Sequence, residues 1–525
     1  MKFGKETGSW SRAKVLAVVC LPVVAIGLSG CAQEAQQPEL AARSKPILER
    51  DGHQFRDLDG DGALTPYEDW RLSPEERTAD LLERMSVEEK VGTLMHSTLP
   101  GRDGEMGVAQ VYDLDALGEL VKGKHVTSFI TRLSLEPIVL AEQNNAVQEL
   151  AEASRLGIPI TISTDPRNHF QYVLGASSSA LGNTQWPELL GFAALRDPDR
   201  VRHFARIGRR EYRAVGIHMA LSPQLDLATE PRWARMSGTF GSNPQLTSDL
   251  GAAYVEGFQG GANGLAPDGV MTVVKHWVGY GAQPEGFDGH NYYGRFAMPG
   301  DSLNLHVDAF RGALNAQAAG VMPAYPIPVG ASYDGEPIEE VSPGYSKQLL
   351  EGLLRGELGF GGIVLSDWAI TRDCNDRCRN PTDDAPQRPQ DISTAWGVED
   401  LTVQERYVKG LEAGLDQFGG TDDVAPLLAA LKAGEIAQER LDLSVARVLL
   451  PKFVMGLFEN PYVDPRAAVA ATGNGDDFAL AAQTQREAHV LLRNESAACP
   501  SHMAVKVWLF GVSADAAREA GLEVV

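Results

Sequence analysis

The segment Gly359–Trp368 places an acid and an aromatic residue directly after a short apolar run. Its residues Ile363–Leu365 predict a buried strand that is covered on both faces. Asp367 lies where that strand leaves the core, and a carboxylate is costly to bury unless it has a partner or a chemical task. At the carboxyl end of a barrel strand, such an acid is a candidate nucleophile or ligand. For an isolated Ser-Asp-Trp sequence, a simple helix cap would be the preferred interpretation.

Polar and aromatic side chains also follow four other segments that predict strands. Because the carboxyl ends of barrel strands face one mouth, we expect all of these groups to meet there. Such mixtures bind sugars, since charged and polar groups hydrogen-bond to hydroxyls and aromatic faces contact apolar C–H groups. Each residue alone has an ordinary structural explanation, but their joint placement does not. The candidate binding residues are Asp165, Arg235, Lys275, His276, Tyr325 and Trp368.

Strand and helix patterns alternate over most of the chain, which predicts an α/β protein with a parallel sheet. Their number and length favour a closed (β/α)8 TIM-like barrel over an open sheet. No glycine-rich loop follows a predicted strand, which argues against nucleotide binding. The predicted strands are 126–130, 158–163, 218–221, 270–274, 320–322, 362–365 and a short one near Leu415. The predicted helices include 138–155, 199–215, 246–259, 303–319 and 347–358.

The N-terminus has the pattern of an export signal. A basic start precedes the apolar run Val15–Leu28, which is short for a membrane span. The run ends in Leu28-Ser29-Gly30-Cys31, which resembles a bacterial lipobox and predicts lipidation of Cys31. A plain secretory signal is the alternative. We therefore expect an exported protein, either a lipoprotein at the periplasmic face of the outer membrane or a periplasmic protein.

The segment Asp57–Glu68 matches the twelve-residue calcium loop position by position. Acids occupy the first, third and fifth positions, a glycine permits the sharp turn at the sixth, and a glutamate stands at the last. An acidic surface turn is the alternative, but the joint match favours a structural calcium ion. We expect no cofactor for catalysis. The expected metal ligands are Asp57, Asp59, Asp61, Ala63, Thr65 and Glu68.

Composition and turn residues predict five parts of the chain. The last part is predicted to contain a helix at 478–488 and strands at 489–492 and 505–510, but it stops in its second βα unit. It therefore reads as the start of a truncated α/β sandwich domain. The parts are the signal peptide 1–31, the tether and calcium loop 32–80, the catalytic barrel 81–455, the linker 456–477 and the incomplete second domain 478–525.

The charge and the cysteines narrow the possible partners. The 525 residues contain 47 basic and 70 acidic side chains, a net charge of −23. Nucleic acids and anionic surfaces need a basic face, so we expect neither as a partner, and contact with a membrane only through the lipid anchor. A neutral or cationic small molecule suits this charge. Cys374 and Cys378 could form a small disulfide in an oxidising periplasm.

Three segments of the chain form a recognisable set: Pro231–Arg235, Lys275–Gly281 and the one that ends in Ser366-Asp367-Trp368. They resemble the signatures of glycoside hydrolase family three, the β-glucosidases and exo-β-glucanases. The resemblance implies that Asp367 is the nucleophile, that Trp368 is a wall of the glycone site and that the other candidate residues hold sugar hydroxyls. A retaining glycosidase needs such a nucleophile and a second group as acid/base.

The resemblance implies a retaining enzyme that removes terminal β-D-glucosyl residues from β-glucosides or β-glucan oligosaccharides. The chain departs from the family pattern at Gly238, where a Glu is common. Many members also take their acid/base from the second domain. One branch, the N-acetylglucosaminidases, uses an Asp-His pair on a barrel loop, which Asp288-Gly289-His290 could mimic. A β-N-acetylhexosaminidase and a non-catalytic carbohydrate-binding lipoprotein are therefore the alternatives.

Overall fold

The computed structural model describes residues 36–102, 109–169, 181–492, 506–507, 513–519 and 523–524. The predicted signal peptide and Cys31 lie outside these residues. Within the described ranges, none of the helices has the length and apolar character needed to cross a membrane.

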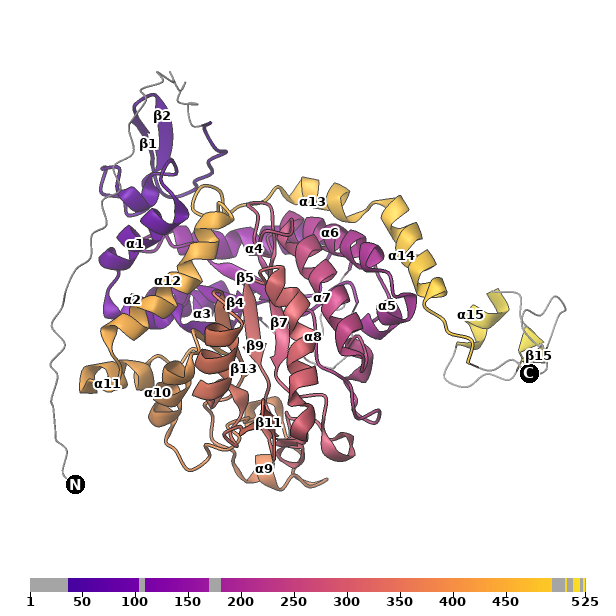
Figure 1. Cartoon of the computed structure of the whole chain (residues 1–525). Helices are drawn as coiled ribbons and strands as arrows, with labels where there is room; N and C mark the ends of the chain where they lie inside the picture. The colour runs from indigo at the N-terminus through magenta and orange to yellow at the C-terminus, as the bar shows by residue number, and fades with distance from the viewer. Residues whose placement is uncertain are drawn as a thin grey trace, which may run out of the picture. The chain divides into compact units, whose positions relative to one another are not determined.

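Eight parallel strands close into a barrel with helices around it, as the sequence predicts (Figure 1). Each strand is followed by a helix that returns the chain to the start of the next strand, which is the connection a parallel sheet requires. In order around the barrel, the strands are β3 (Met95–Thr98), β4 (Ser128–Ile130), β5 (Thr161–Thr164), β6 (Met219–Ala220), β7 (Met271–Trp277), β9 (Gly320–Pro323), β13 (Ile363–Trp368) and β14 (Gln417–Gly419).

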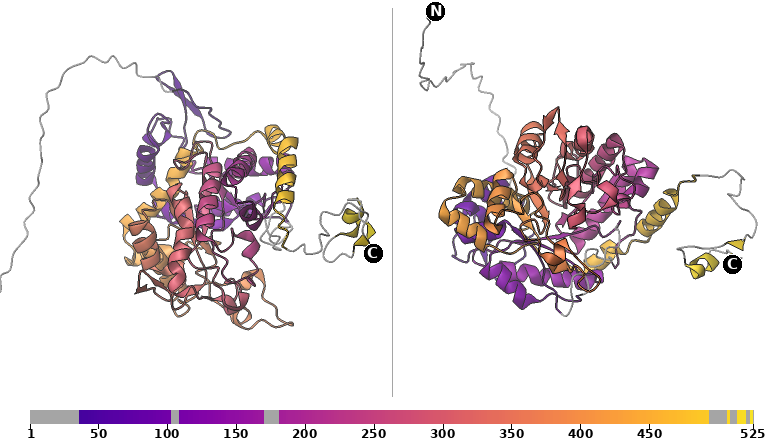
Figure 2. Two further views of the ribbon diagram at one scale, coloured as in Figure 1. Left: turned by 45° about the vertical axis from the view of Figure 1, so that its right-hand side comes forward. Right: turned by 90° about the horizontal axis from the view of Figure 1, so that it is seen from below.

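The outer helices agree well with the predicted ones. Figure 2 shows them around the strands when the barrel is seen from below. Their inner faces form the main apolar core with the outward-pointing strand residues. The principal helices are α4 (Pro137–Glu152), α6 (Pro198–Ala214), α7 (Pro244–Gln259), α8 (Leu303–Asn315), η8 (Gln348–Glu357), α10 (Val403–Ala413), α11 (Ala425–Ala433) and α12 (Gln438–Val454).

Strand β3 is absent from the predicted set. Met95 is its only apolar residue, so its sequence carries no strand signal. It becomes a strand by pairing with β14 on one side and β4 on the other. Inside the barrel, the ring of His96 is hydrogen-bonded to Ser163 Oγ at 2.7 Å. Tertiary pairing therefore decides this element.

Two capping boxes open the first helices, as their spacing predicts. Ser73 Oγ accepts the backbone N–H of Glu76 at the start of α1 (Pro74–Arg84). Ser86 and Glu89 do the same for α2 (Val87–Thr93). Each box satisfies backbone donors that the first helical turn leaves without partners.

The described part of the predicted tether is bound to the barrel. Residues 36–46 lead into a hairpin of β1 (Ile47–Arg50) and β2 (His53–Arg56). Glu152 Oε1 accepts the backbone N–H groups of Arg43, Ser44 and Lys45 at 2.8, 2.6 and 2.8 Å. Residues 43–45 of the predicted tether are therefore bound to the end of α4, which polar composition alone does not reveal.

Glu152 is the centre of this attachment. Its other oxygen accepts a hydrogen bond from Arg56 at 2.8 Å, and both side chains are almost completely buried. Burial alone would raise the pKa of Glu152, but the Tyr462 hydroxyl and the three backbone N–H groups lower it to about 2. The carboxylate therefore stays ionised and joins the N-terminal segment, the hairpin and the C-terminal end of α4.

The segment after the barrel also differs from its prediction. Residues 456–477, predicted to be a linker, include helix α13 (Pro465–Thr472), which lies against α4 and α6. Helix α14 (Gly475–Glu487) follows, but 489–492, predicted to be a strand, have no regular structure. A strand needs a neighbouring strand to pair with, and the apolar pattern alone does not supply one. Further on, β15 (Lys506–Val507), α15 (Ala514–Glu519) and β16 (Glu523–Val524) are described.

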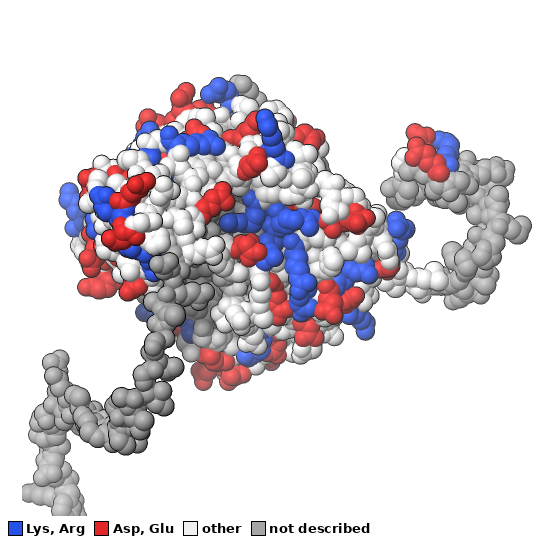
Figure 3. All heavy atoms as spheres, turned by 90° about the horizontal axis from the view of Figure 1, so that it is seen from above, with Lys and Arg blue, Asp and Glu red and all other residues white. Residues whose placement is uncertain are grey.

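Basic side chains gather on the end of the barrel that Figure 3 shows from above. Helix α6 carries Arg200, which binds Glu487 of α14 at 2.9 Å, and Arg210, which pairs with Asp477. Arg202 binds Glu256 of α7 at 2.7 Å. These arginines therefore attach α14 and α7 to α6.

Replacing Glu152 by Gln is expected to lower the free energy of unfolding by about 3–5 kcal/mol, because Arg56 would keep a buried charge without its counter-charge. Denaturant unfolding measures the change. Since the pKa of Glu152 is lowered from 4.5 to about 2, its contribution is complete above pH 4.5 and is lost as the pH falls towards 2. The gap between wild type and variant should shrink over that range.

Glu149 provides the matched control. It lies in the same helix, and its carboxylate pairs with Arg43 at the surface. Exposed ion pairs contribute little, so Glu149→Gln should change the free energy of unfolding by less than about 1 kcal/mol. Equal losses in the two variants would contradict the role given to Glu152.

Candidate active site

The predicted site residues lie at the carboxyl ends of five strands. Asp165 follows β5, Arg235 lies in the loop after β6, Lys275 and His276 are in β7, Tyr325 follows β9, and Asp367 and Trp368 end β13. The two-residue period of a strand explains how they reach the mouth. Met271 and Val273 fill the barrel interior, and Lys275 continues their row. Ile363 and Leu365 also fill the barrel interior, and Asp367 continues their row along β13.

Asp367 is held at the mouth by fixed hydrogen-bond donors. Its Oδ1 accepts the hydroxyl of Tyr325 at 2.6 Å and the backbone N–H of Trp368 at 2.8 Å. Its Oδ2 lies 3.5 Å from Nε2 of His276, and the side chain is 11% exposed. Burial, and then the charge of Asp367, raise the pKa of Tyr325 well above its usual value, so the phenol keeps its proton. The carboxylate is thus oriented with one oxygen fixed and the side chain open to the mouth.

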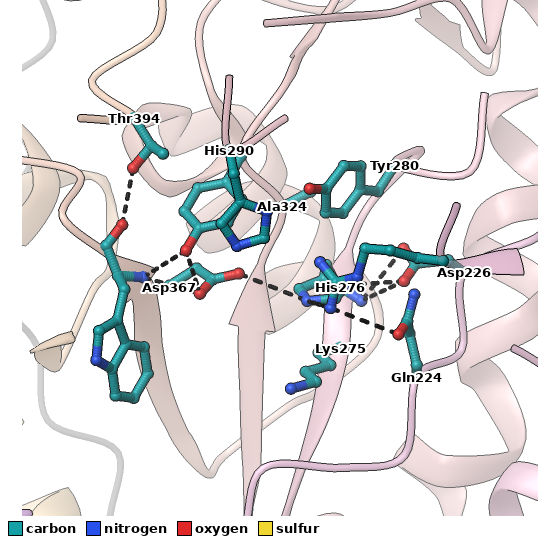
Figure 4. Close-up of polar contacts among 12 residues, drawn as sticks. Gln224, Asp226, Lys275, His276, Tyr280, His290, Ala324, Asp367 and Thr394 are labelled. Atoms are coloured by element: carbon teal, nitrogen blue, oxygen red, sulfur yellow. Dashed lines mark hydrogen bonds and ion pairs between the residues drawn. The ribbon is translucent and has the colours of Figure 1, made fainter. Parts of the chain in front are cut away.

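Asp226 supports His276 from behind. Its Oδ2 lies 2.8 Å from Nδ1 of His276, and it also accepts that residue's backbone N–H at 3.3 Å (Figure 4). Arg235 Nη2 lies 3.3 Å from Nε2 of the same ring. Burial, and then Arg235 and Lys275, lower the pKa of His276 well below its usual value. The imidazole is therefore neutral and fixed from both sides.

Asp226 was not among the predicted site residues. Burial raises its pKa to about 7, against the opposing effect of Arg235. The signal that could have identified it is its position after β6, the same relation to a strand that the predicted residues have. Its role as a buried partner becomes visible only when the side chain of His276 is placed.

Asp165 is clamped between two cations. Lys275 Nζ lies 3.2 Å from Oδ1, and Arg132 Nη1 lies 2.6 Å from Oδ2. Burial would raise the pKa of Asp165, but Lys275 and Arg132 lower it below its usual value, so the carboxylate is ionised. Arg132 was also missed by the sequence analysis, although it follows β4 as the other residues follow their strands. Among the described residues, Arg132 is therefore a further cationic group at the mouth, beside the predicted Arg235 and Lys275.

Trp368 is the last residue of β13 and is fixed by its neighbours. Its ring centroid is 5.7 Å from that of His96. Gly420 has a φ of +71°, and a Cβ there would lie 2.4 Å from the indole. The backbone carbonyl of Trp368 accepts the hydroxyl of Thr394 at 2.8 Å (Figure 4). The end of β14 must therefore be glycine for the indole to lie against it.

A loop after β7 brings Asp288 and His290 to the same mouth. Asp288 accepts hydrogen bonds from Trp233 Nε1 at 3.1 Å and the Tyr280 hydroxyl at 3.2 Å, and it pairs with Nδ1 of His290. Burial would raise the pKa of Asp288, but His290 and then Arg235 hold it well below its usual range. The ring of His290 lies 4.6 Å from that of Tyr325, which contacts Asp367. Figure 4 labels Tyr280 and His290, which contact Asp288, and also Asp367, which contacts Tyr325.

The disulfide between Cys374 and Cys378 is present, as their spacing suggested. It lies in the loop that follows β13 and includes the short helix α9 (Asp376–Arg379). Arg406 binds Asp373 of this loop at 2.7 Å and the backbone carbonyl of Thr371 at 3.2 Å. The loop beside the candidate nucleophile is thus fastened at two points.

Three of the residues predicted to bind calcium lie close together in the structure. Carboxylate oxygens of Asp57, Asp59 and Asp61 lie within 4.8 Å of one another. Glu68 is turned inward, where Oε1 accepts the N–H of Leu58 at 2.6 Å and Oε2 accepts the hydroxyl of Thr65 at 2.6 Å. The predicted closing ligand therefore serves as a helix cap in the structure. Ala63, also predicted as a ligand, has its N–H bonded to Asp61.

A closed parallel barrel with this mixture of charged, polar and aromatic groups at one mouth has the architecture of a glycosidase. The family model for the glycosyl hydrolase family 3 N terminal domain matches residues 86–450. The chain therefore belongs to glycosyl hydrolase family 3 and is a glycosidase.

Curated relatives support this membership over nearly the whole chain. It is 48% identical over 519 residues to a periplasmic beta-glucosidase/beta-xylosidase of Dickeya chrysanthemi, covering 98% of the chain and 78% of that protein. It is 40% identical over 491 residues to beta-glucosidase C of Emericella nidulans, covering 93% of the chain and 72% of that protein.

Solved structures show the same fold. A β-glucosidase from Erythrobacter marinus superposes with a TM-score of 0.66 and 25% identity, over 87% of this chain. A β-glucosidase from Listeria innocua in complex with isofagomine has a TM-score of 0.60 and 25% identity, over 82% of this chain. The chain spans 59% and 54% of the lengths of these two proteins.

Replacing Arg132 by Gln is expected to raise the KM for a glycoside about tenfold and to change kcat less. The guanidinium holds Asp165, which we expect to hold sugar hydroxyls in ground state and transition state alike. One charge-assisted hydrogen bond of this kind corresponds to about a factor of ten in affinity. Steady-state kinetics measure the effect, and Arg311→Gln, which removes an exposed ion pair on α8, is the control. An unchanged KM would contradict the role of Arg132.

Proposed function

We propose that this protein is a retaining exo-acting β-glucosidase that removes terminal β-D-glucosyl residues from β-glucosides or β-glucan oligosaccharides. The observation that carries the proposal is the oriented carboxylate of Asp367, with Tyr325 and the Trp368 N–H on one oxygen. The names of the relatives from Dickeya and Emericella support the β-glucoside as substrate.

In this mechanism Asp367 attacks the anomeric carbon. One bond forms between Oδ2 and C1 as the bond to the leaving oxygen breaks, and that oxygen takes up a proton from the second group, which acts as acid. The same group then accepts a proton from water, which attacks C1, breaks its bond to Oδ2 and releases the sugar with retained configuration. The hydrogen bonds on Oδ1 fix the carboxylate before the substrate arrives, so no reorientation is needed during the reaction. The neutral ring of His276 lies beside Oδ2 and contributes no charge that would hold that oxygen in an ion pair.

The glycone is bound by the remaining residues of the mouth. Asp165 accepts hydrogen bonds from sugar hydroxyls, and Lys275 and Arg132 donate to them while they neutralise Asp165. Arg235 adds a third cationic donor near His276. Trp368 contacts the apolar face of the sugar ring.

We place the protein in the periplasm, with a lipid on Cys31 as its membrane anchor. The pattern before Cys31 supports the anchor. The disulfide between Cys374 and Cys378 supports an oxidising compartment, and the Dickeya relative is described as periplasmic.

Replacing Asp367 by Ala is expected to lower kcat for 4-nitrophenyl β-D-glucoside by about a thousandfold or more, because the nucleophile is lost. In Asp367→Gly, added azide should restore cleavage and give the α-glucosyl azide, since azide attacks from the vacant side. A 2-deoxy-2-fluoro-glucoside should label the wild-type peptide that contains Asp367, as mass spectrometry of a digest would show.

Asp383→Ala is the control and should keep wild-type kinetics, because Asp383 is exposed in the loop that follows β13. A label on another peptide, or full activity in Asp367→Ala, would overturn the assignment. Sugar binding by the wild type without turnover of the aryl glucoside would favour the non-catalytic carbohydrate-binding lipoprotein.

A β-N-acetylhexosaminidase is the second candidate, and the pair formed by Asp288 and His290 favours it. An imidazole held by a carboxylate beside the nucleophile can act as acid/base. The same assays with 4-nitrophenyl N-acetyl-β-D-glucosaminide distinguish the two functions. Faster turnover of that substrate, abolished by His290→Ala, would replace the β-glucosidase proposal.

We also propose a structural calcium ion at Asp57, Asp59 and Asp61, supported by their converging carboxylates. A chelator is expected to lower the melting temperature of the wild type, because an ion bound only by the folded state stabilises it. Added calcium should reverse the shift. The double variant Asp59→Asn/Asp61→Asn should not respond to the chelator, and an unshifted wild-type melting curve would show that no calcium is bound.

A further inference from the structure

The buried segment Ser393–Trp396 contacts two separate parts of the mouth. It belongs to the loop that follows β13, and each of its four side chains is at most 1% exposed. Thr394 is hydrogen-bonded to the end of β13, where Trp368 stands. Trp396 is hydrogen-bonded to the loop between β7 and α8, which reaches the mouth from the other side. One short stretch of chain therefore joins the two sides.

Thr394 holds the turn at the end of β13. Its backbone N–H donates to the carbonyl of Ala369 at 3.2 Å, and its hydroxyl donates to the carbonyl of Trp368 at 2.8 Å (Figure 4). Ala369 has a φ of +64°, in the left-handed region that residues other than glycine rarely adopt. Such a conformation persists when the surrounding structure holds it in place. The direction in which Trp368 leaves the strand therefore depends on Thr394.

Trp396 holds the loop on the other side of the mouth. Its Nε1 donates to the carbonyl of Gly289 at 2.8 Å. In the sequence, Gly289 lies between Asp288 and His290, so this bond fixes the backbone at the centre of the pair. The ring of His290 lies 4.6 Å from that of Tyr325. The distance of the pair from the nucleophile therefore depends on Trp396.

The buried segment is itself anchored from behind. Ser393 Oγ donates to the carbonyl of Arg372 at 2.6 Å. Asp391, two residues earlier, accepts Nδ2 of Asn375 at 3.0 Å. Asn375 also caps the short helix α9, which lies in the part of the loop that the disulfide closes. These bonds join the outgoing and returning arms of the loop, so the segment cannot follow one side of the mouth alone.

We propose that Thr394 and Trp396 are positioning residues that hold Trp368 and the pair of Asp288 and His290 at a fixed distance across the mouth. The inference rests on the proposed glycosidase function, in which Trp368 contacts the sugar ring. It adds the element that keeps the two sides together. Neither residue touches the reacting atoms, so each acts only through the group that it holds.

Thr394 is tested by two variants that differ in the hydroxyl. Thr394→Val keeps the shape of the side chain but removes the donor to Trp368, and KM for 4-nitrophenyl β-D-glucoside should rise about tenfold with a smaller change in kcat. Thr394→Ser keeps the hydroxyl and should stay within about twofold of the wild type. An unchanged KM in Thr394→Val, or an equal rise in Thr394→Ser, would overturn the role of Thr394.

Trp396 is tested by a double-mutant cycle with His290. Trp396→Phe keeps an aromatic ring but removes the donor to Gly289, and kcat/KM should fall about tenfold. In the background of His290→Ala it should fall by less than about twofold, because the group that Trp396 holds is already gone. Trp70→Phe is the control, since it removes a similar bond from an indole to the carbonyl of Gln54 at 2.9 Å in the N-terminal hairpin. Additive losses would show a merely structural role and contradict the inference.

A wild type that does not hydrolyse the glucoside would refute the proposed function and not this inference. Calorimetric titration with glucose then replaces the kinetics. Binding should be about tenfold weaker in Thr394→Val and unchanged in Thr394→Ser, because only the first variant releases the wall that contacts the sugar. Equal affinities in the three proteins, or no binding by any of them, would overturn the inference.

Discussion

Charges that are removed from water at the mouth of the barrel must all be paired, and the active site is built around this constraint. Asp165 is ionised because Lys275 and Arg132 flank it. Asp367 is held by Tyr325, whose phenol keeps its proton next to the carboxylate. Each buried carboxylate of the site therefore has cations or hydrogen-bond donors beside it. Several charged groups can then lie close together without the cost of an isolated buried ion.

The closed barrel makes this arrangement possible. Parallel strands end at one mouth, so residues more than two hundred positions apart in the chain, such as Asp165 and Asp367, meet without long connecting loops. The loops then supply what the strands cannot. The β7–α8 loop brings His290 to Tyr325, while the loop after β13 is fastened by its disulfide and Arg406.

The same logic of buried partners extends to the outside of the barrel. Glu152, at the end of α4, accepts hydrogen bonds from the N-terminal segment and from Arg56. Arginines of α6 form ion pairs with α14. These attachments lie in segments that the sequence predicts to be a tether and the start of a second domain. A polar segment gives no sign of being docked, because its anchor is an acceptor far away in sequence. For the same reason the apolar run 489–492 predicted a strand that found no partner among the described residues.

The sequence by itself determined the barrel class, most strands and helices, the disulfide, and the seven residues placed at the mouth, because apolar periodicity and strand-end position are local signals. It did not reveal β3, whose single apolar residue has no pattern, nor Arg132 and Asp226, which matter through Asp165 and His276. Nor did it show that Glu68 turns inward or that Arg43–Lys45 dock on Glu152. Those features depend on which donor meets which acceptor across the fold, and only the closed tertiary structure sets those distances.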